Sequence, residues 1–184
     1  MSGNNQTLPL VRGDGRSVVF TARLCGDEDL REILALQRTV TQNVGDSELF
    51  VSTTREELED SLRNDWCLAV YDGDKMVAFT LMVCNRITER NLGVYLGYCE
   101  EELLQCVTYD TTFVHPDYRG FGLQRELGRM KDEAAVRMGA REALSTISPQ
   151  NAYSLSNARQ RGFAICEERI LYSGVRRYLM RKKL

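Results

Sequence analysis

One segment constrains the fold of this chain more than any other: an apolar strand that leads through a proline and two glycines into an amphipathic helix. The strand-like residues end at Val114, and Pro116 cannot continue a ladder because it has no N–H to donate. Gly120 and Gly122 follow, and apolar residues then recur at helical spacing (Leu123, Leu127, Met130 and Ala134). The pattern predicts a strand, a tight turn and a helix over 121–138.

A turn of this composition can hold a phosphate or a pyrophosphate. Glycines let the backbone approach a ligand closely, and the N–H groups at a helix start favour anions, to which Arg119 adds a cation. A Walker A loop would need Gly-Lys-Ser/Thr, and the dinucleotide fingerprint would need a third glycine where Arg125 stands. An ordinary strand-to-helix connection with a glycine cap is the alternative.

The remaining periodic segments predict a mixed sheet. Strands are expected at 17–25, 66–71, 75–85, 106–114, 142–147, 163–172 and 175–182, and further helices at 27–44, 54–64 and 151–161. Thr54 and Glu57 form a capping box, and Asp72-Gly73 is a hairpin signal. Residues 87–105 show no clear period and are expected to be irregular. Hairpins towards both ends and βαβ units between them predict an α/β (α+β) mixed sheet with helices on both faces.

Composition excludes several classes of protein. The chain has 184 residues, 43% of them hydrophobic, and its 24 basic and 26 acidic residues give a net charge of −2, so neither a highly charged disordered chain nor a nucleic-acid partner is expected. The longest apolar run, Met76–Cys84, contains Thr80 and is shorter than the about 20 residues of a membrane span. Without a signal-peptide pattern at its start, the chain is expected to be cytoplasmic, with no membrane partner. We expect a disordered leader over 1–16 and a single domain over 17–184.

The cysteine and histidine content argues against a metal site. The six cysteines contain no Cys-x-x-Cys pair, and the only histidine is His115. Because zinc sites usually combine four clustered ligands, we expect buried thiols and no metal.

Two segments resemble the signatures of the GNAT superfamily of acyl-CoA-dependent N-acetyltransferases. Arg119-Gly-Phe-Gly-Leu-Gln124, after a strand and a His-Pro step, resembles the pattern Arg/Gln-x-x-Gly-x-Gly/Ala, from which Gln124 departs. Asn151-Ala-Tyr-Ser154, followed by Gly162-Phe163, resembles the second pattern, Asn-x-x-Ser/Ala and then Gly-Phe. The resemblance covers roughly 17–184 and implies a GNAT-like fold of about six or seven mostly antiparallel strands, splayed between the fourth and fifth.

The resemblance also implies a cofactor and its contacts. Acetyl-CoA would be the co-substrate, with its pyrophosphate on the backbone of Arg119, Gly120, Phe121, Gly122, Leu123 and Gln124. Its pantetheine would lie along backbone groups near Phe113 and Val114, and Asn151 and Ser154 would contact the cofactor from the other side. A bulge in the strand 106–114 would free an amide for the thioester oxygen.

The implied reaction is direct attack of a primary amine, on a small molecule or a peptide, on the thioester. The amine must lose a proton, and the candidate base is Asp110. Strand alternation places Val107, Tyr109 and Phe113 on one face and Thr108, Asp110 and Thr112 on the other. Asp110 could equally lie on a solvated face, and Glu100, Glu101 or Glu102 could replace it, line a pocket for a cationic acceptor or lie on the surface.

The sequence does not identify a general acid for this mechanism. The tyrosine that often protonates the thiolate is replaced by Ala158, and Tyr153 lies about 140° away around the same helix. Water or another residue could serve, while His115 is expected to be structural. A non-catalytic acyl-CoA-binding module or sensor is therefore the alternative function, followed by a nucleotide-phosphate binder of another kind. The resemblance is also compatible with a homodimer.

Overall fold

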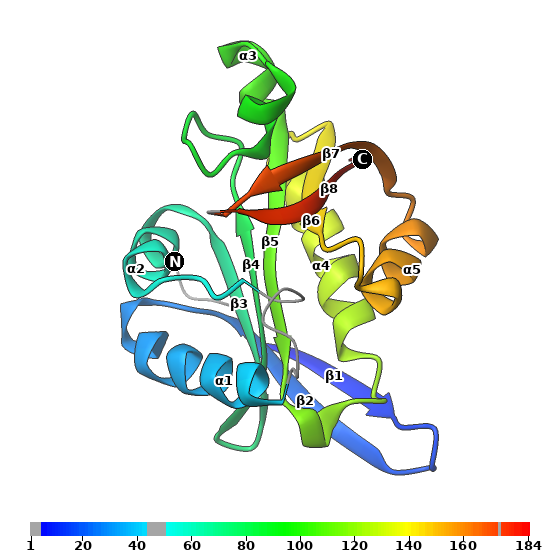
Figure 1. Ribbon diagram of the computed structural model, residues 1–184. Coiled ribbons are helices and arrows are strands. Elements are labelled where there is room, and N and C mark those ends of the chain that lie inside the picture. The colour runs from blue at the N-terminus through cyan, green and yellow to red at the C-terminus, as the bar shows by residue number, and fades with distance from the viewer. Residues whose placement is uncertain (1–4, 44–50, 173) are drawn as a thin grey trace. The chain divides into compact units, whose positions relative to one another are not determined.

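The computed structural model describes residues 5–43, 51–172 and 174–184 (Figure 1). Its strands are β1 (Gln6–Val11), β2 (Ser17–Leu24), β3 (Trp66–Asp72), β4 (Lys75–Val83), β5 (Cys106–Val114), β6 (Glu142–Ile147), β7 (Ala164–Leu171) and β8 (Val175–Lys183). Its α-helices are α1 (Leu30–Gln42), α2 (Arg55–Asn64), α3 (Glu100–Leu103), α4 (Leu123–Arg137) and α5 (Ala152–Gln160). Short 3-10 helices are η1 (Asp27–Asp29), η2 (Leu92–Leu96) and η3 (Pro116–Tyr118).

The strands form one mixed sheet in the order β1-β2-β3-β4-β5-β6-β8-β7. The β5–β6 ladder is parallel, whereas the β1–β2, β2–β3, β3–β4, β6–β8 and β7–β8 ladders are antiparallel. The predicted mixed, mostly antiparallel sheet is confirmed, with eight strands where about six or seven were expected.

The additional strand lies in the segment predicted to be a disordered leader, and that prediction is wrong for residues 6–11. Strand β1 pairs with β2 from Gln6↔Ala22 to Val11↔Ser17, and Leu8 is 5% exposed in the core. Pro9 is tolerated because β1 is an edge strand. The chain turns at Asp14-Gly15, where Gly15 has φ 89°, and this dipeptide is a sequence signal for a hairpin.

Backbone contacts divide the chain into two compact units. The first unit comprises Met1–Asn43, Ser52–Met82 and Thr111–Met130, and the second comprises Val44–Val51, Val83–Asp110 and Lys131–Leu184. Strand β5 and helix α4 each contribute to both units. The single domain over 17–184 stays a prediction.

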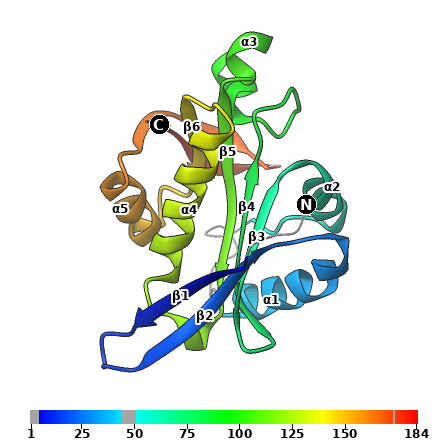
Figure 2. The ribbon, with the colours of Figure 1, turned by 180° about the vertical axis from the view of Figure 1, so that it is seen from behind.

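In the first unit, the sheet is covered on both faces. The face that carries Phe20, Ala22, Leu68 and Val70 packs against the start of α4, through Phe121, Leu123, Leu127 and Met130. On the opposite face of β3, the Cys67 thiol reaches the Ser61 carbonyl of α2, and Tyr71 bonds to Asp29 just before α1. In Figure 1 α1 lies in front of β2, and from behind, in Figure 2, β1 and β2 lie in front of α1. The predicted capping box is confirmed, because Thr54 and Glu57 cap α2 reciprocally.

In the second unit, η2 covers the sheet in a segment that was expected to be irregular. Leu92 packs with Cys106, Leu144 and Leu179. The Asn91 side chain, fully buried, donates to the carbonyls of Arg86 (3.1 Å) and Leu103 (3.0 Å). This amide orders a segment that has no hydrophobic period of its own, because it supplies hydrogen bonds that no regular ladder provides.

The second unit also contains a charged cluster around Asp132 of α4. The Asp132 carboxylate accepts hydrogen bonds from the Tyr109 hydroxyl (2.7 Å), the Arg161 guanidinium (3.0 Å) and the Lys182 ammonium (2.7 Å). Burial raises the pKa of Asp132, but the hydrogen bonds from Lys182 and Tyr109 and the charge of Arg161 outweigh it, so the pKa lies below its usual value.

We expect Asp132→Ala to lower the free energy of unfolding by about 2 kcal/mol at pH 7, because it leaves two cations and a buried hydroxyl without their acceptor. The side chain is 28% exposed, so the loss should stay below that of a fully buried ion pair. Because the folded pKa is depressed, this stabilisation is present above the unfolded value of about 3.9 and is lost as the pH falls through the folded value. Urea unfolding of the wild type and the variant at pH 7 and pH 3 measures this stability difference. Glu101→Gln on α3 is the exposed control. An equal stability difference at both pH values would contradict the electrostatic explanation.

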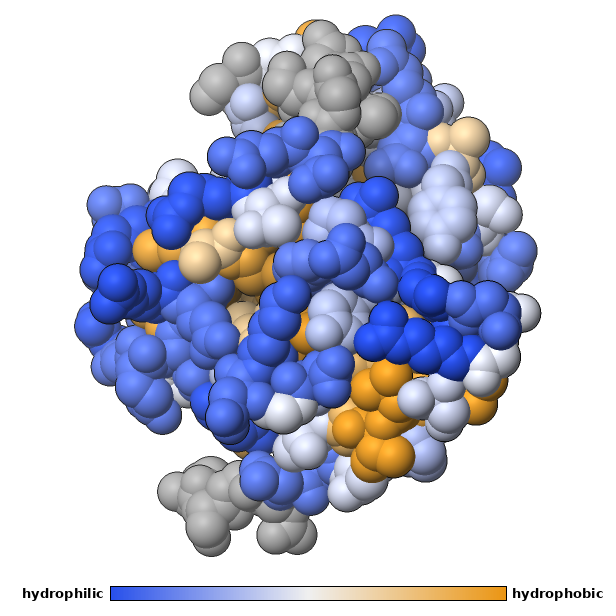
Figure 3. Space-filling view, turned by 90° about the horizontal axis from the view of Figure 1, so that it is seen from below, coloured by the Kyte–Doolittle hydropathy of each residue, from blue (hydrophilic) through white to orange (hydrophobic). Residues whose placement is uncertain are grey.

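The surface seen in Figure 3 is mostly hydrophilic, and apolar side chains emerge only in confined areas. In the first unit, the exposed apolar residues include Val11 (63%) and Val19 (62%) of the β1–β2 hairpin. No helix among the described residues is both long and apolar enough to cross a membrane.

Candidate functional site

The glycine turn, residues 119–124, follows β5 and η3 in the first unit. The His115 amide donates to the Val77 carbonyl of β4 (2.8 Å), and its Nδ1 accepts from the Asp117 amide (3.3 Å) as the chain enters η3. Burial lowers the pKa of His115, and the positive charge of Lys75 lowers it further. These contacts agree with the structural role expected for His115.

The turn from Arg119 to Gln124 presents its backbone outward because its apolar side chains point inward. Phe121 is 2% exposed and packs edge-on against Phe20 at 5.4 Å between ring centroids, and Leu123 is 1% exposed. Gly120 and Gly122 have φ values of 87° and 77°, which side chains other than glycine rarely adopt.

Helix α4 begins directly after the turn. The Glu126 amide donates to the Gly122 carbonyl (3.1 Å), so the amides of Leu123, Gln124 and Arg125 precede the helical ladder. Outward amides at a helix start, with exposed Arg119 beside them, form a site suited to an anion. The turn therefore has the strand-turn-helix geometry predicted from the sequence, and its binding of a phosphate stays a prediction.

Strand β5 corrects one expectation, because its side chains do not alternate regularly. Tyr109 bonds to Asp132 of α4, whereas Thr111 bonds to Thr53, just before α2 (2.8 Å between hydroxyl oxygens). Phe113 stacks on Phe79, the cross-strand partner of Ala69 on the α1–α2 face of β3. Tyr109 and Phe113 therefore point to opposite faces, and their predicted placement on one face is wrong. A change of face between Tyr109 and Thr111 is what a β-bulge produces.

The β5–β6 ladder in the second unit is short. Its described parallel pairs end at Thr108↔Leu144, although β6 continues to Ile147. Beyond them, the Ser145 hydroxyl donates to the Tyr109 carbonyl (2.9 Å). The pairing thus ends where the sheet was expected to splay, because β5 and β6 are the fourth and fifth strands when β1 is left out of the count.

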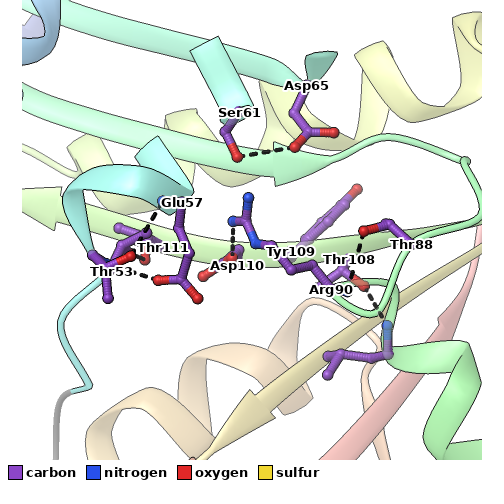
Figure 4. A network of polar contacts seen from close by, with 12 residues as sticks. Thr53, Glu57, Ser61, Asp65, Thr88, Arg90, Thr108, Tyr109, Asp110 and Thr111 are labelled. Carbon is purple, nitrogen blue, oxygen red and sulfur yellow. Dashed lines mark hydrogen bonds and ion pairs between the residues drawn. The ribbon is translucent and has the colours of Figure 1, made fainter. Parts of the chain in front are cut away.

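Asp110 lies in the second unit and forms an ion pair that the sequence did not predict. The Arg90 guanidinium contacts its Oδ2 at 2.7 Å, with the two side chains 17% and 31% exposed (Figure 4). Thr108, on the same strand, accepts a hydrogen bond from the Leu92 amide at 2.9 Å (Figure 4). Arg90 comes from the segment without periodicity, so no sequence pattern could have linked it to Asp110.

The negative charge of Asp110 also acts on Tyr172, a residue that the sequence did not single out. The Tyr172 hydroxyl, just after β7, is 2.9 Å from the Thr146 hydroxyl of β6. Burial raises the pKa of Tyr172; the hydrogen bond with Thr146 lowers it, and the negative charge of Asp110 raises it again, so the phenol stays protonated at neutral pH. The second unit therefore holds a carboxylate and a protonated phenol in one electrostatic environment.

The second predicted segment forms the start and end of α5. Asn151 is its N-cap, because its Oδ1 accepts from the Ser154 amide (3.0 Å). After the helix, Gly162 has φ 89°, and the Phe163 amide donates to the Ala158 carbonyl (3.0 Å). Asn151 and Ser154 thus have a clear structural role, which leaves their predicted cofactor contacts as a proposal.

The three alternative candidates for the base lie together in α3. Glu100, Glu101 and Glu102 form the first turn of α3, where Glu102 accepts from the Cys99 amide (2.8 Å). Within the described ranges, no group of three or more His, Cys, Asp or Glu side chains could hold a metal ion.

Taken together, the two units carry a mixed sheet, a short parallel β5–β6 ladder and a glycine turn at the start of α4. The fold is that of the GNAT acetyltransferases, as three solved structures indicate. A GNAT-family acetyltransferase from Listeria monocytogenes 4b F2365 aligns with a TM-score of 0.71 and 11% identity over 96% of this chain and 100% of that one. The PaiA N-acetyltransferase from Thermoplasma acidophilum, in complex with coenzyme A, aligns with a TM-score of 0.66 and 13% identity over 90% and 99%.

YncA from Salmonella typhimurium, solved with its cofactor acetyl-CoA, aligns with a TM-score of 0.63 and 18% identity over 90% and 94%. No protein-family model matches this chain, and no curated protein matches it by sequence. The structural likeness confirms the fold predicted from the two sequence segments.

Proposed function

We propose that the protein is an N-acetyltransferase that moves the acetyl group of acetyl-CoA to a primary amine of a small molecule or peptide. The observation that carries the proposal is the glycine turn at the start of α4 within a GNAT fold. Neighbours of this fold hold coenzyme A and acetyl-CoA, which supports the same co-substrate here. The chemistry follows from the proposed contacts of this chain's own residues.

Cofactor binding is assigned first to backbone groups of the first unit. The backbone from Arg119 to Gln124 binds the pyrophosphate through outward amides. Backbone groups of Phe113 and Val114 bind the pantetheine, and the fully buried Phe113 side chain restricts this role to the main chain. Asn151 and Ser154 are proposed as further polar contacts of the cofactor. The residues present thus fit a phosphorylated thioester.

A bulge in β5, inferred from the change of face between Tyr109 and Thr111, supplies the proposed oxyanion contact. The Thr111 carbonyl accepts from the Thr80 hydroxyl (3.1 Å), so a side chain of β4 takes part in the bonding at this point. An amide released from the ladder by a bulge can donate to the thioester oxygen as negative charge develops there.

Proton transfer is assigned to Asp110 and, more weakly, to Tyr172. Asp110 accepts the proton of the attacking ammonium, the amine nitrogen bonds to the acetyl carbon, and the carbon–sulfur bond breaks. The departing thiolate takes a proton from a hydroxyl or from water, and the second proton lost by the acetylated nitrogen replaces it. Tyr172 is a protonated phenol of the second unit whose pKa the charge of Asp110 raises, and Ala158 carries no hydroxyl.

Thiol release in the presence of acetyl-CoA tests the function directly. We expect release above the hydrolysis background with at least one amine from a panel of polyamines, amino acids, aminoglycosides and peptides. Binding of acetyl-CoA without amine-dependent release from any of them would contradict catalysis.

A non-catalytic acyl-CoA-binding module is the second candidate. The Arg90–Asp110 ion pair favours it, because the contact occupies an oxygen of the carboxylate that would have to accept the proton. This candidate predicts a measurable affinity for acetyl-CoA and no acetylated product. Amine acetylation that Asp110→Asn abolishes would exclude it.

A further inference from the structure

The β1–β2 hairpin brings two arginines to the glycine turn of the first unit. The guanidinium carbons of Arg12 and Arg16 lie 5.4 Å and 5.8 Å from the centroid of the Phe121 ring. A Cβ on Gly120 would lie 3.2 Å from Cγ of Arg12, so the arginine stem packs directly against the turn. Figure 2 shows the hairpin formed by β1 and β2 from behind.

The position of the two guanidinium groups follows from the hairpin. The Arg12 amide donates to the Arg16 carbonyl (2.8 Å), which closes the turn and places both side chains at its base. Phe121 is buried against Phe20 on one side and covered by the arginines on the other. The two arginines therefore lie against side-chain and backbone positions of the turn itself, at Phe121 and Gly120.

The charges around the turn favour an anion. Arg12 forms an ion pair with Asp14, whose Oδ1 also accepts a hydrogen bond from the Arg16 amide (3.1 Å). Arg16 is exposed, and Arg119 and Arg125 add cations on the turn and on the first turn of α4. Several guanidinium groups repel one another unless an anion lies between them, and guanidinium binds phosphate oxygens in a bidentate manner.

We propose that Arg16 and Arg12 bind a phosphate group of the cofactor whose pyrophosphate the glycine turn holds. This inference rests on the proposed function and extends the cofactor site to the segment before residue 17. Arg16 is the principal ligand, because Arg12 shares its charge with Asp14. The arginines act on binding and take no part in the chemical step.

Calorimetric titration of the full chain with CoA and with 3′-dephospho-CoA tests the inference. We expect Arg16→Gln to raise the Kd for CoA about 10-fold, the effect of losing one charge-assisted contact, and Arg12→Gln to raise it less. Arg16→Lys should recover part of the affinity, and Arg16→Gln should flatten the salt dependence of Kd. Arg38→Gln, an exposed arginine of α1, is the matched control and should bind like the wild type.

The two ligands separate the sources of the phosphate. An equal loss with both ligands assigns the hairpin to the diphosphate, and a loss with CoA alone assigns it to the 3′-phosphate; either result supports the proposal. Unchanged Kd values and salt dependence in both Gln variants, with melting temperatures like the wild type, would overturn it. A wild-type chain that binds neither ligand would overturn the proposed function as well, whereas normal wild-type binding with indifferent variants removes this inference alone.

Discussion

Replacing Asp110 by Asn is expected to lower kcat for amine acetylation by about 10²- to 10⁴-fold, because the amide cannot accept the proton of the attacking ammonium. The affinity for acetyl-CoA should stay unchanged, since the phosphate contacts lie in the turn of the first unit. Steady-state thiol release and calorimetric binding measure the two quantities on the same samples.

A loss of folding stability would not explain the loss of activity expected for Asp110→Asn. The Arg90–Asp110 pair is partly exposed, and pairs of this kind contribute about 0–1 kcal/mol, so the variant should fold. Asp74→Asn, an exposed carboxylate in the β3–β4 turn, is the matched control. A D110N variant that acetylates amines at the wild-type rate would remove Asp110 as the base.

The second large effect is expected from Gly122→Ala, which should weaken CoA binding at least about 10-fold. An alanine at φ 77° costs about 1–2 kcal/mol, and its Cβ would lie 3.3 Å from the Arg125 guanidinium. The turn relieves this strain by changing conformation, which misplaces the amides that hold the pyrophosphate.

Gly73→Ala separates the loss of binding from the cost of backbone strain. Gly73, in the β3–β4 turn, has φ 57°, and a Cβ there would meet no atom within 4 Å. Both variants should lose comparable stability in urea unfolding, but only Gly122→Ala should lose affinity for CoA. Equal affinities in the two variants would show that the glycine turn does not hold the cofactor.

Features with a local cause were predictable from the sequence. The capping box at Thr54, the strand 106–114 and the start of α5 at Asn151 depend on residues that are neighbours in the chain. The glycine turn belongs to the same group, because its two positive φ values are a property of Gly120 and Gly122. The prediction failed where local signals conflicted. Pro9 disfavours a strand, yet residues 6–11 form an edge strand that pairs with β2 across the Asp14-Gly15 turn.

The sequence by itself thus determined most of the strands and helices after residue 17, the helix caps and the turn that suits a phosphate, since each depends on backbone preferences and hydrogen bonds over a few residues. Only the tertiary structure decided that Arg90 pairs with Asp110, that Tyr172 shares its environment, and that Arg12 and Arg16 lie over Phe121. It also decided the change of face between Tyr109 and Thr111. These contacts join residues far apart in the chain, and long-range contacts follow from packing, which no local pattern encodes.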